Sequence, residues 1–240
     1  MSSRPLEEFE NRIELRAMRP GDFDAIVALQ LRCFPSTKPW GRTQFDSLVR
    51  VFPEGQTVVV VGEHIVASSC SLIVDYREYD DWHDWMTVSD NGMIRNHDPE
   101  GDTLYGIEIQ VDPNHRGKKL ARRLYEARKE YCRRHNLARV LVGGRIPGFA
   151  EHRKTLSANA YVDRVRRKEL HDPVLTTQLA NEFTLRQIVE DYLPSDEDSA
   201  GYATILEWSN LEYQPPGTRR RSRRAYEPVR VASVQYQMRS

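Results

Sequence analysis

The sequence predicts a mixed α/β protein in which a sheet is flanked by helices. Two observations lead to this fold class. Apolar, β-branched runs occupy 57–61, 65–74, 104–111 and 138–144, and segments with apolar residues at helical spacing lie between several of them. The element order is β-α-α-β-β-β-α-β-α-β-β, without an internal repeat. With 240 residues, 39% hydrophobic and 29% charged, the composition is that of a globular chain with one well-filled core or two small ones.

Local signals delimit the elements of the first half. Asp22 and Thr43 can each cap a helix, and Pro35 and Pro39 end the first helix before the second begins. The acidic segment 75–102, rich in Trp, Asp and Gly, is predicted as a long loop. The predicted elements are a strand at 13–18, helices at 22–34 and 43–49, and strands at 57–61 and 65–74 that form a hairpin.

The second half continues the alternation of strands and helices. Its longest helix carries an apolar stripe that includes Leu120 and Leu124. Gly143 and Gly144, inside a strand, indicate either a bulge or a close approach to the backbone. The predicted elements are a strand at 104–111, a helix at 116–135, a strand at 138–144, a polar helix at about 155–169, a short helix before Asn181, and strands at 183–189 and 202–208.

Charge is separated along the chain, although 35 basic and 35 acidic residues balance. Residues 75–102 hold nine acidic and two basic residues, 112–134 hold nine basic and three acidic ones, and 217–240 hold seven Arg and one Glu. Zero net charge argues against a protein that coats polyanions generally. The opposed segments indicate either two ligands of opposite charge or ordinary solvated charge runs.

Composition also disfavours several classes of protein. No apolar run approaches the roughly 20 residues of a membrane span. The N-terminal twelve residues contain no apolar core of a signal peptide, so a cytoplasmic protein is expected. Cys33, Cys70 and Cys132 are widely spaced and without a CxxC pair, so reduced thiols and no metal site are expected.

The stretch most informative about chemistry is IQVDPNHRGKKLARRL, residues 109–124. It predicts a strand, a turn containing glycine and the start of a basic helix. Backbone N–H groups at a helix N-terminus lack intrahelical partners and lie at the positive end of the helix dipole, so they can hold a pyrophosphate. Lys118 and Lys119 add positive charge, although a solvated basic helix shows the same pattern.

Residues 116–121 resemble the signature of the GNAT superfamily of acetyl-CoA-dependent N-acetyltransferases, Arg/Gln-x-x-Gly-x-Gly/Ala. Lys119 stands where the central Gly, which lets the backbone approach the phosphates, is expected. The element order from Ile13 to Tyr213 agrees with this family, so 1–213 is expected to be one acetyltransferase domain. The resemblance implies a mixed, mostly antiparallel sheet flanked by helices, the acyl-CoA N-acyltransferase fold.

The resemblance also implies how acetyl-CoA, the acetyl donor, would bind. It would lie in a splay between strands 104–111 and 138–144, with pantetheine amides on the backbone of Ile109 and Val111. Its phosphates would rest on the amides of one loop, formed by Arg116, Gly117, Lys118, Lys119, Leu120 and Ala121.

A small-molecule or peptidyl amine would then attack the thioester directly in a ternary complex. An alkylammonium of pKa ~10.4 needs roughly 4.6 kcal/mol to lose its proton at pH 7, which a base or desolvation must offset. Glu108 is the first candidate base, with His83 and His97 as alternatives; a structural pairing with Arg is the other explanation of Glu108.

Other positions complete the expected acceptor site. The family's frequent general-acid Tyr falls at Gln178, which cannot protonate a thiolate, so Tyr161 and Tyr192 are weaker candidates. The acidic loop is either a solvated insertion or a wall that favours a cationic amine through its charge and one Trp. The Trp in that loop would be Trp82 or Trp85. In this fold, the acceptor site would be bordered by Phe34, Lys38 and Trp40, which lie between the first two helices.

Composition changes abruptly after Tyr213. Residues 214–228 are predicted as a Pro- and Arg-rich linker, and 229–240 resemble the first strand of a carbon–nitrogen hydrolase (nitrilase) domain. The chain therefore resembles the N-terminal part of bacterial proteins that fuse the two domains, and such a hydrolase is a candidate fused or associated partner. A contact with nucleic acid is a second, less favoured explanation for the arginines at 219–224.

Two other functions stay open beside an N-acetyltransferase. One is a non-catalytic acyl-CoA-binding module that regulates a carbon–nitrogen hydrolase, which Gln178 favours. The other is a basic-tailed interaction protein. The acceptor and a homodimeric assembly are open as well.

Overall fold

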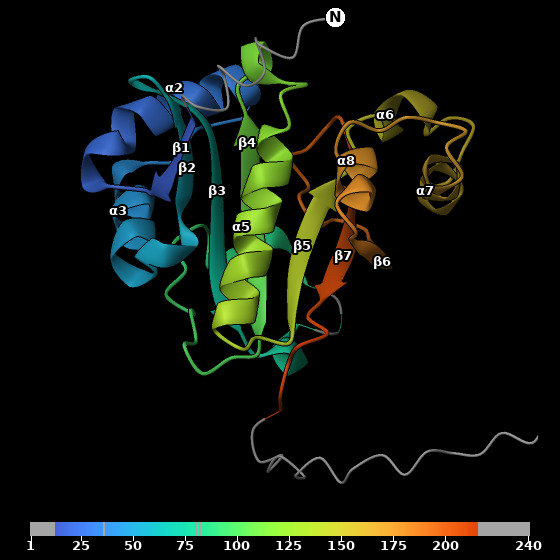
Figure 1. Cartoon of the computed structure of the whole chain (residues 1–240). Helices are drawn as coiled ribbons and strands as arrows, with labels where there is room; N and C mark the ends of the chain where they lie inside the picture. The colour runs from blue at the N-terminus through green and yellow to red at the C-terminus, as the bar shows by residue number, and fades with distance from the viewer. Residues whose placement is uncertain (1–12, 36, 80, 82, 216–240) are drawn as a thin grey trace, which may run out of the picture.

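The computed structural model describes residues 13–35, 37–79, 81 and 83–215, which form one seven-stranded sheet with helices on both faces (Figure 1). The strand order is β1-β2-β3-β4-β5-β7-β6, and the β4–β5 pair is parallel while the other five pairs are antiparallel. This confirms the predicted mixed, mostly antiparallel sheet. The strands are β1 (Ile13–Ala17), β2 (Thr57–Val61), β3 (His64–Val74), β4 (Thr103–Val111), β5 (Arg139–Arg145), β6 (Thr184–Val189) and β7 (Ala203–Ser209).

Different helices cover the two faces of the sheet. α2 contacts β3 and β4 from one face, whereas α5 packs on β3, β4 and β5 from the other, where α8 lies against β5 (Figure 1). Leu120 and Leu124 of α5 pack with Val59 and Ala67, so the predicted stripe faces the sheet. The α-helices are α2 (Phe23–Cys33), α3 (Arg42–Val51), α4 (Trp85–Ser89), α5 (Leu120–Arg134), α6 (Phe149–His152), α7 (Ala158–Arg166) and α8 (Leu175–Ala180); short 3-10 turns are η1 (Pro20–Asp22), η2 (Pro53–Gly55), η3 (Tyr76–Glu78) and η4 (Pro113–His115).

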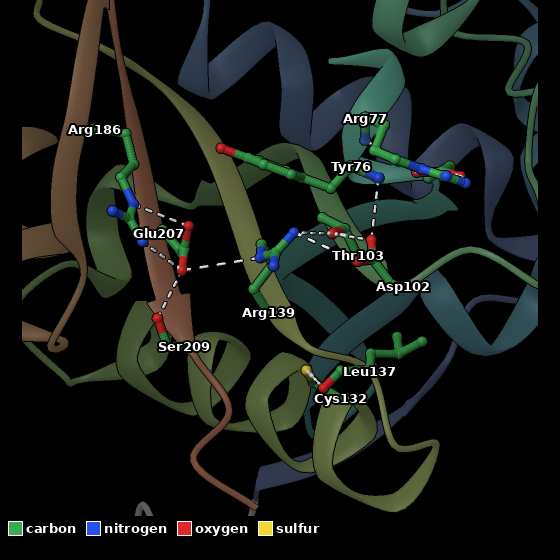
Figure 2. A network of polar contacts seen from close by, with 11 residues as sticks. Tyr76, Arg77, Asp102, Thr103, Cys132, Leu137, Arg139, Arg186, Glu207 and Ser209 are labelled. Carbon is green, nitrogen blue, oxygen red and sulfur yellow. Dashed lines mark hydrogen bonds and ion pairs between the residues drawn. The ribbon is translucent and has the colours of Figure 1, made fainter. Parts of the chain in front are cut away.

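A network of charged side chains joins β4, β5, β7 and β6 at the end of the sheet where β4 begins (Figure 2). Arg139 of β5 lies 3.5 Å from Asp102 and 3.4 Å from the Thr103 hydroxyl, and its other side is 3.9 Å from Glu207 of β7. Glu207 accepts a hydrogen bond from Arg186 of β6. Pairing of β4 with β5 starts at this network, where Thr103 lies opposite Arg139, so these two strands are held together at one end.

Four expectations about the elements need correction. Neither expected helix cap forms, because the Asp22 side chain makes no capping bond to α2 and Thr43 lies inside α3, whose N-cap is Gly41. The segment 75–102 is not a loop throughout, because the Asp84 carboxylate accepts from the Thr87 N–H at 2.6 Å and caps the short helix α4. The polar helix expected at about 155–169 is limited to α7, which Ser157 caps. The helix expected from 116 begins only at Leu120.

Part of the expected organisation falls outside the described residues. Trp82, the linker from residue 216 onward and the hydrolase-like strand 229–240 all belong to this part. Near the end of the described residues, the Gln214 N–H donates to the Asn136 side chain, and the Gln214 carbonyl accepts from it. Within the described residues, no helix is both long enough and apolar enough to cross a bilayer.

Candidate active site

Strands β4 and β5 separate after four paired positions. The parallel register runs from Thr103 opposite Arg139 to Gly106 opposite Val142 and stops, although β4 continues to Val111 and β5 to Arg145 (Figure 1). Each strand keeps its other neighbour along this stretch, β3 for β4 and β7 for β5. The expected splay between 104–111 and 138–144 is therefore present in the fold.

The backbone of β4 turns polar groups into this splay. The Asp112 N–H donates to the Val66 carbonyl, so the neighbouring pair Ala67–Val111 is a non-hydrogen-bonded pair. The N–H and carbonyl of Val111 therefore point away from β3. The same holds for Ile109, two residues earlier, because strand orientation repeats every second residue. The Val111 carbonyl accepts from the Cys33 thiol at 3.3 Å. Both backbone positions expected for pantetheine therefore face the opening.

A β-bulge directs the Glu108 side chain to the α2 face. Gly106 lies opposite Ser71 while Glu108 lies opposite Cys70, so β4 has one extra residue at this point. Without the bulge, Gly106 and Glu108 would face the same side of the sheet. Gly106 instead lies against the Arg128 guanidinium of α5, and Glu108 reaches Gln30 of α2, on the opposite face.

Arg128 stabilises the bulge from the α5 face. It is buried in α5 and donates to the Ser71 hydroxyl at 3.0 Å, the Cys70 carbonyl at 2.8 Å and the Glu108 carbonyl at 2.5 Å. A Cβ atom at Gly106 would lie 2.5 Å from the guanidinium. The glycine in β4 therefore leaves room for the arginine that satisfies carbonyls displaced by the bulge.

Glu108 is a carboxyl whose surroundings favour its neutral form. Burial raises the pKa of Glu108 to about 7, against the opposing effects of the Gln30 hydrogen bond and the Arg128 charge. Gln30 donates to Glu108 at 2.9 Å and accepts from the Trp40 N–H at 3.0 Å, so it fixes the carboxyl relative to the loop after α2. Such a pKa suits a group that exchanges protons near neutral pH.

The glycine pair in β5 admits one polar side chain from each face. The β5–β7 register is continuous, so Gly143 and Gly144 mark a close approach and not a bulge. A Cβ atom at Gly143 would overlap the Tyr192 hydroxyl, and one at Gly144 would overlap the Gln178 amide. Both glycines lie beyond the last β4–β5 pair, at the splay.

Gln178 is buried with an unpaired amide oxygen. The side chain is 2% exposed, and Oε1 has no hydrogen-bond partner among the described residues. Leaving a buried acceptor unpaired costs about 1–3 kcal/mol, and such a group is a reason to look for a ligand. The residue at the family's general-acid position thus lies beside the splay as an acceptor.

On the α2 face, three side chains form a hydrogen-bonded series that ends at the splay. His83 Nε2 lies 2.8 Å from the Tyr105 hydroxyl, which lies 3.2 Å from the Tyr192 hydroxyl. Burial lowers the pKa of His83 and raises the pKa of both tyrosines, so the ring is neutral and the phenols keep their protons. Trp85 closes the same face by donating its indole N–H to the Ile107 carbonyl at 2.9 Å.

The loop before α5 provides backbone donors at a basic helix start. The first bond to the α5 turn runs from the Arg123 N–H to the Lys119 carbonyl, so the N–H groups of Ala121 and Arg122 have no helical partner. Gly117 and Lys119 have φ values of 78° and 60°. Lysine is thus left-handed where the family has glycine, at a cost of roughly 1–2 kcal/mol.

The other predicted site residues lie in less suitable places. His97 accepts from the Ile73 N–H of β3 at 3.0 Å. The Tyr161 hydroxyl donates to the buried Asp172 at 2.9 Å. Phe34 lies under the Arg145 guanidinium at 5.6 Å, and Lys38 is exposed. Among the described residues, no three His, Cys, Asp or Glu side chains are grouped so as to hold a metal ion.

The model of the acetyltransferase (GNAT) family matches residues 23–147, more than half of the 240 residues and including the loop 116–121. The chain belongs to the GNAT acetyltransferase family. The curated relatives of this GNAT protein differ in extent. It is 33% identical over 210 residues to YkwB of Bacillus subtilis (strain 168), an uncharacterized N-acetyltransferase, covering 84% of this chain and 91% of YkwB.

A second relative is much longer than the chain. The probable hydrolase YhcX of Bacillus subtilis (strain 168) is 43% identical over 233 residues, which cover 97% of this chain and 45% of YhcX. The GNAT protein thus spans less than half of that relative's length.

Solved structures share the fold of this GNAT protein. The loading GNATL domain of CurA from Lyngbya majuscula superposes with a TM-score of 0.72 at 17% identity, covering 82% of this chain and 97% of that one. The GNAT-like decarboxylase GphF, in complex with isobutyryl-CoA, superposes with a TM-score of 0.67 at 24% identity. The match covers 82% of this chain and 98% of that one.

Sequence reasoning did not find several residues that shape the site of this GNAT protein. Gln30, Tyr105 and Arg128 are ordinary in the sequence and gain their roles only through contacts between elements. Gly106, in the middle of an apolar strand, was a usable signal, because a strand glycine often marks a bulge or a close approach.

Proposed function

We propose that the protein is an N-acetyltransferase that moves the acetyl group of acetyl-CoA to a primary amine. The observation that supports this best is the splay, where β4 and β5 stop pairing after Gly106 and Val142 and the backbone of Ile109 faces the opening. An amide-bearing chain such as pantetheine can pair there as an extra strand would. The unpaired Gln178 oxygen offers one more acceptor for an amide N–H.

The phosphate-bearing end of CoA would lie at the start of α5. The amides of Ala121 and Arg122 supply donors, and the helix dipole favours an anion there. Lys119 and Arg122 also line a groove of about 580 Å³ that runs between α5 and β1. This end of the helix therefore combines backbone donors with exposed cations.

Glu108 is proposed as the base that takes a proton from the incoming ammonium. Its pKa of about 7 lies closer to that of an alkylammonium, ~10.4, than the ordinary glutamate value of 4.5 does. Transfer would be direct, without an acyl-enzyme. Burial raises the pKa of the half-buried Cys33 to about 11, so it is a thiol and a poor nucleophile.

Calorimetry with acetyl-CoA and a thiol-release assay over a panel of primary amines test this function. We expect saturable binding, turnover with at least one amine, and a loss of about 10²–10⁴-fold in kcat/KM for Glu108→Gln. Glu169→Gln, exposed after the end of α7 and outside the groove between α5 and β1, is the matched control and should keep full activity. No detectable binding of acetyl-CoA, or equal rates for both variants, would contradict the proposal.

A regulatory acyl-CoA-binding module for a carbon–nitrogen hydrolase is the second candidate. Two observations favour it: Gln178 stands at the general-acid position, and the probable hydrolase YhcX is longer than the chain it matches. The same two assays separate the candidates, because a sensor would bind acetyl-CoA but release no thiol with any amine.

A further inference from the structure

The series His83–Tyr105–Tyr192 has a fixed direction. His83 Nδ1 lies 3.1 Å from the Asp81 carbonyl, which can only accept, so Nδ1 carries the ring proton. Nε2 of the neutral ring then accepts from the Tyr105 hydroxyl. Tyr105 donates its one proton in that bond, so its oxygen accepts from Tyr192. All the protons therefore point from Tyr192 toward His83.

The free end of this series is the Tyr192 oxygen at the splay. Its hydroxyl lies directly over Gly143, the first β5 residue beyond the last pair with β4. Because its proton points to Tyr105, its remaining lone pairs can accept from a donor in the opening. The three side chains are at most 4% exposed, so bulk water does not supply that donor readily.

We propose that Tyr192, Tyr105 and His83 form a proton relay that carries the proton of the reacting nitrogen to the departing sulfur. The proposal rests on the proposed transferase function and assigns the general-acid role that Gln178 cannot perform. Tyr192 is the member that touches the reactants, and Tyr105 and His83 act through it.

The ammonium substrate gives up two protons in the reaction, one to Glu108 and one to the relay. After Glu108 has taken the first ammonium proton, the amine nitrogen forms a bond to the thioester carbonyl carbon and becomes positive. It gives a second proton to Tyr192, whose own proton moves to Tyr105, and the Tyr105 proton moves to His83 Nε2. The C–S bond breaks, the relay runs back, and Tyr192 protonates the sulfur. The electron pair that the attack moved onto the carbonyl oxygen re-forms the C=O bond as sulfur leaves with the electrons of the C–S bond. The products are the amide, the free CoA thiol and the proton on Glu108, which is released to solvent.

A proton inventory, kcat measured in mixtures of H2O and D2O, tests the relay in the unaltered protein. Several protons in motion predict a curved dependence on the deuterium fraction, whereas a linear one would overturn the relay. Tyr105→Phe should lower kcat by about 10²-fold, leave KM for acetyl-CoA within about 2-fold, and make the inventory linear.

Tyr79→Phe is the matched control. The Tyr79 ring packs against His83 and Tyr105, but its hydroxyl accepts from Asn96 and lies outside the series. It should keep the rate and the curvature of the unaltered protein. Tyr105→Phe with unchanged kcat would contradict the relay.

The tautomer of His83 can be read without any turnover, which separates failure of the relay from failure of the transferase function. Long-range 1H–15N NMR spectra should show a proton on Nδ1 and an unprotonated Nε2. A proton on Nε2 in the free protein would reverse the series and overturn the proposal.

Discussion

Replacing Glu108 by Gln is expected to stabilise the folded protein at pH 8 while removing its proposed base. The folded protein holds the Glu108 proton up to pH about 7, whereas an unperturbed carboxyl loses it near 4.5. Between these values the native state binds more protons than the unfolded chain, so the free energy of unfolding falls as pH rises. The neutral amide of glutamine does not titrate and avoids this loss.

The expected size follows from the pKa difference. At ~1.4 kcal/mol per pKa unit, the difference between the folded and unfolded pKa of Glu108 limits the gain in the free energy of unfolding at pH 8 to about 3 kcal/mol. For a domain of this size, that is a rise of roughly 6–12 °C in Tm. The amide oxygen introduced by Glu108→Gln can still accept from Gln30, as the carboxyl does. Its NH2 group then faces Gln110, which donates to the carboxyl at 3.2 Å, so this second bond is kept only if the Gln110 amide turns its oxygen toward residue 108.

Urea unfolding of both proteins at pH 5 and pH 8 measures this effect. We expect nearly equal stability at pH 5 and a more stable E108Q at pH 8. Glu207→Gln is a control of opposite sign, because hydrogen bonds from Arg186 and Ser209 lower the pKa of Glu207 despite its burial. That variant should be destabilised by nearly the same amount at pH 5 and pH 8, because a carboxyl with a lowered pKa changes stability with pH only below about 4.5. The same difference between E108Q and the unaltered protein at both pH values would refute the reasoning.

Three further substitutions test the surroundings of the splay. Lys119→Gly should raise the free energy of unfolding by about 1 kcal/mol, because glycine adopts the left-handed backbone at this position without strain. Lys119→Ala should give no such gain. Urea unfolding measures both variants, and equal effects would contradict the prediction. Gln178→Leu removes the unpaired oxygen and should weaken acetyl-CoA binding in calorimetry; unchanged affinity would show that Gln178 does not contact the donor. Gly106→Ala should cost about 1–3 kcal/mol in thermal unfolding because Arg128 is held by three hydrogen bonds, while Gly21→Ala, with no atom nearby, should be neutral.

Sequence patterns determined much of the fold because they depend on local chemistry. Alternating and apolar runs located all seven strands within a few residues, and the glycine pair at 143–144 indicated a close approach as one of two explanations. The helix start after 109–111 was also recognisable, although periodicity could not show that positive φ angles at Gly117 and Lys119 delay it to Leu120. Asp84 is a suitable N-cap residue, but the sequence did not distinguish it from the other acidic residues of 75–102.

Only the tertiary structure decided what the candidate residues can do. Glu108 faces α2 because one extra residue in β4 reverses the alternation, and no spacing rule predicts where a bulge falls. Its pKa depends on burial beside Gln30 and Arg128, which lie 78 and 20 residues away in the chain. Contacts between distant segments place His83 and Tyr192 in one hydrogen-bonded series through Tyr105, whereas His97 bonds the Ile73 N–H and Tyr161 bonds Asp172. The sequence by itself thus determined most of the elements and the basic helix start, whereas proton chemistry depends on burial and long-range contacts that exist only in the folded chain.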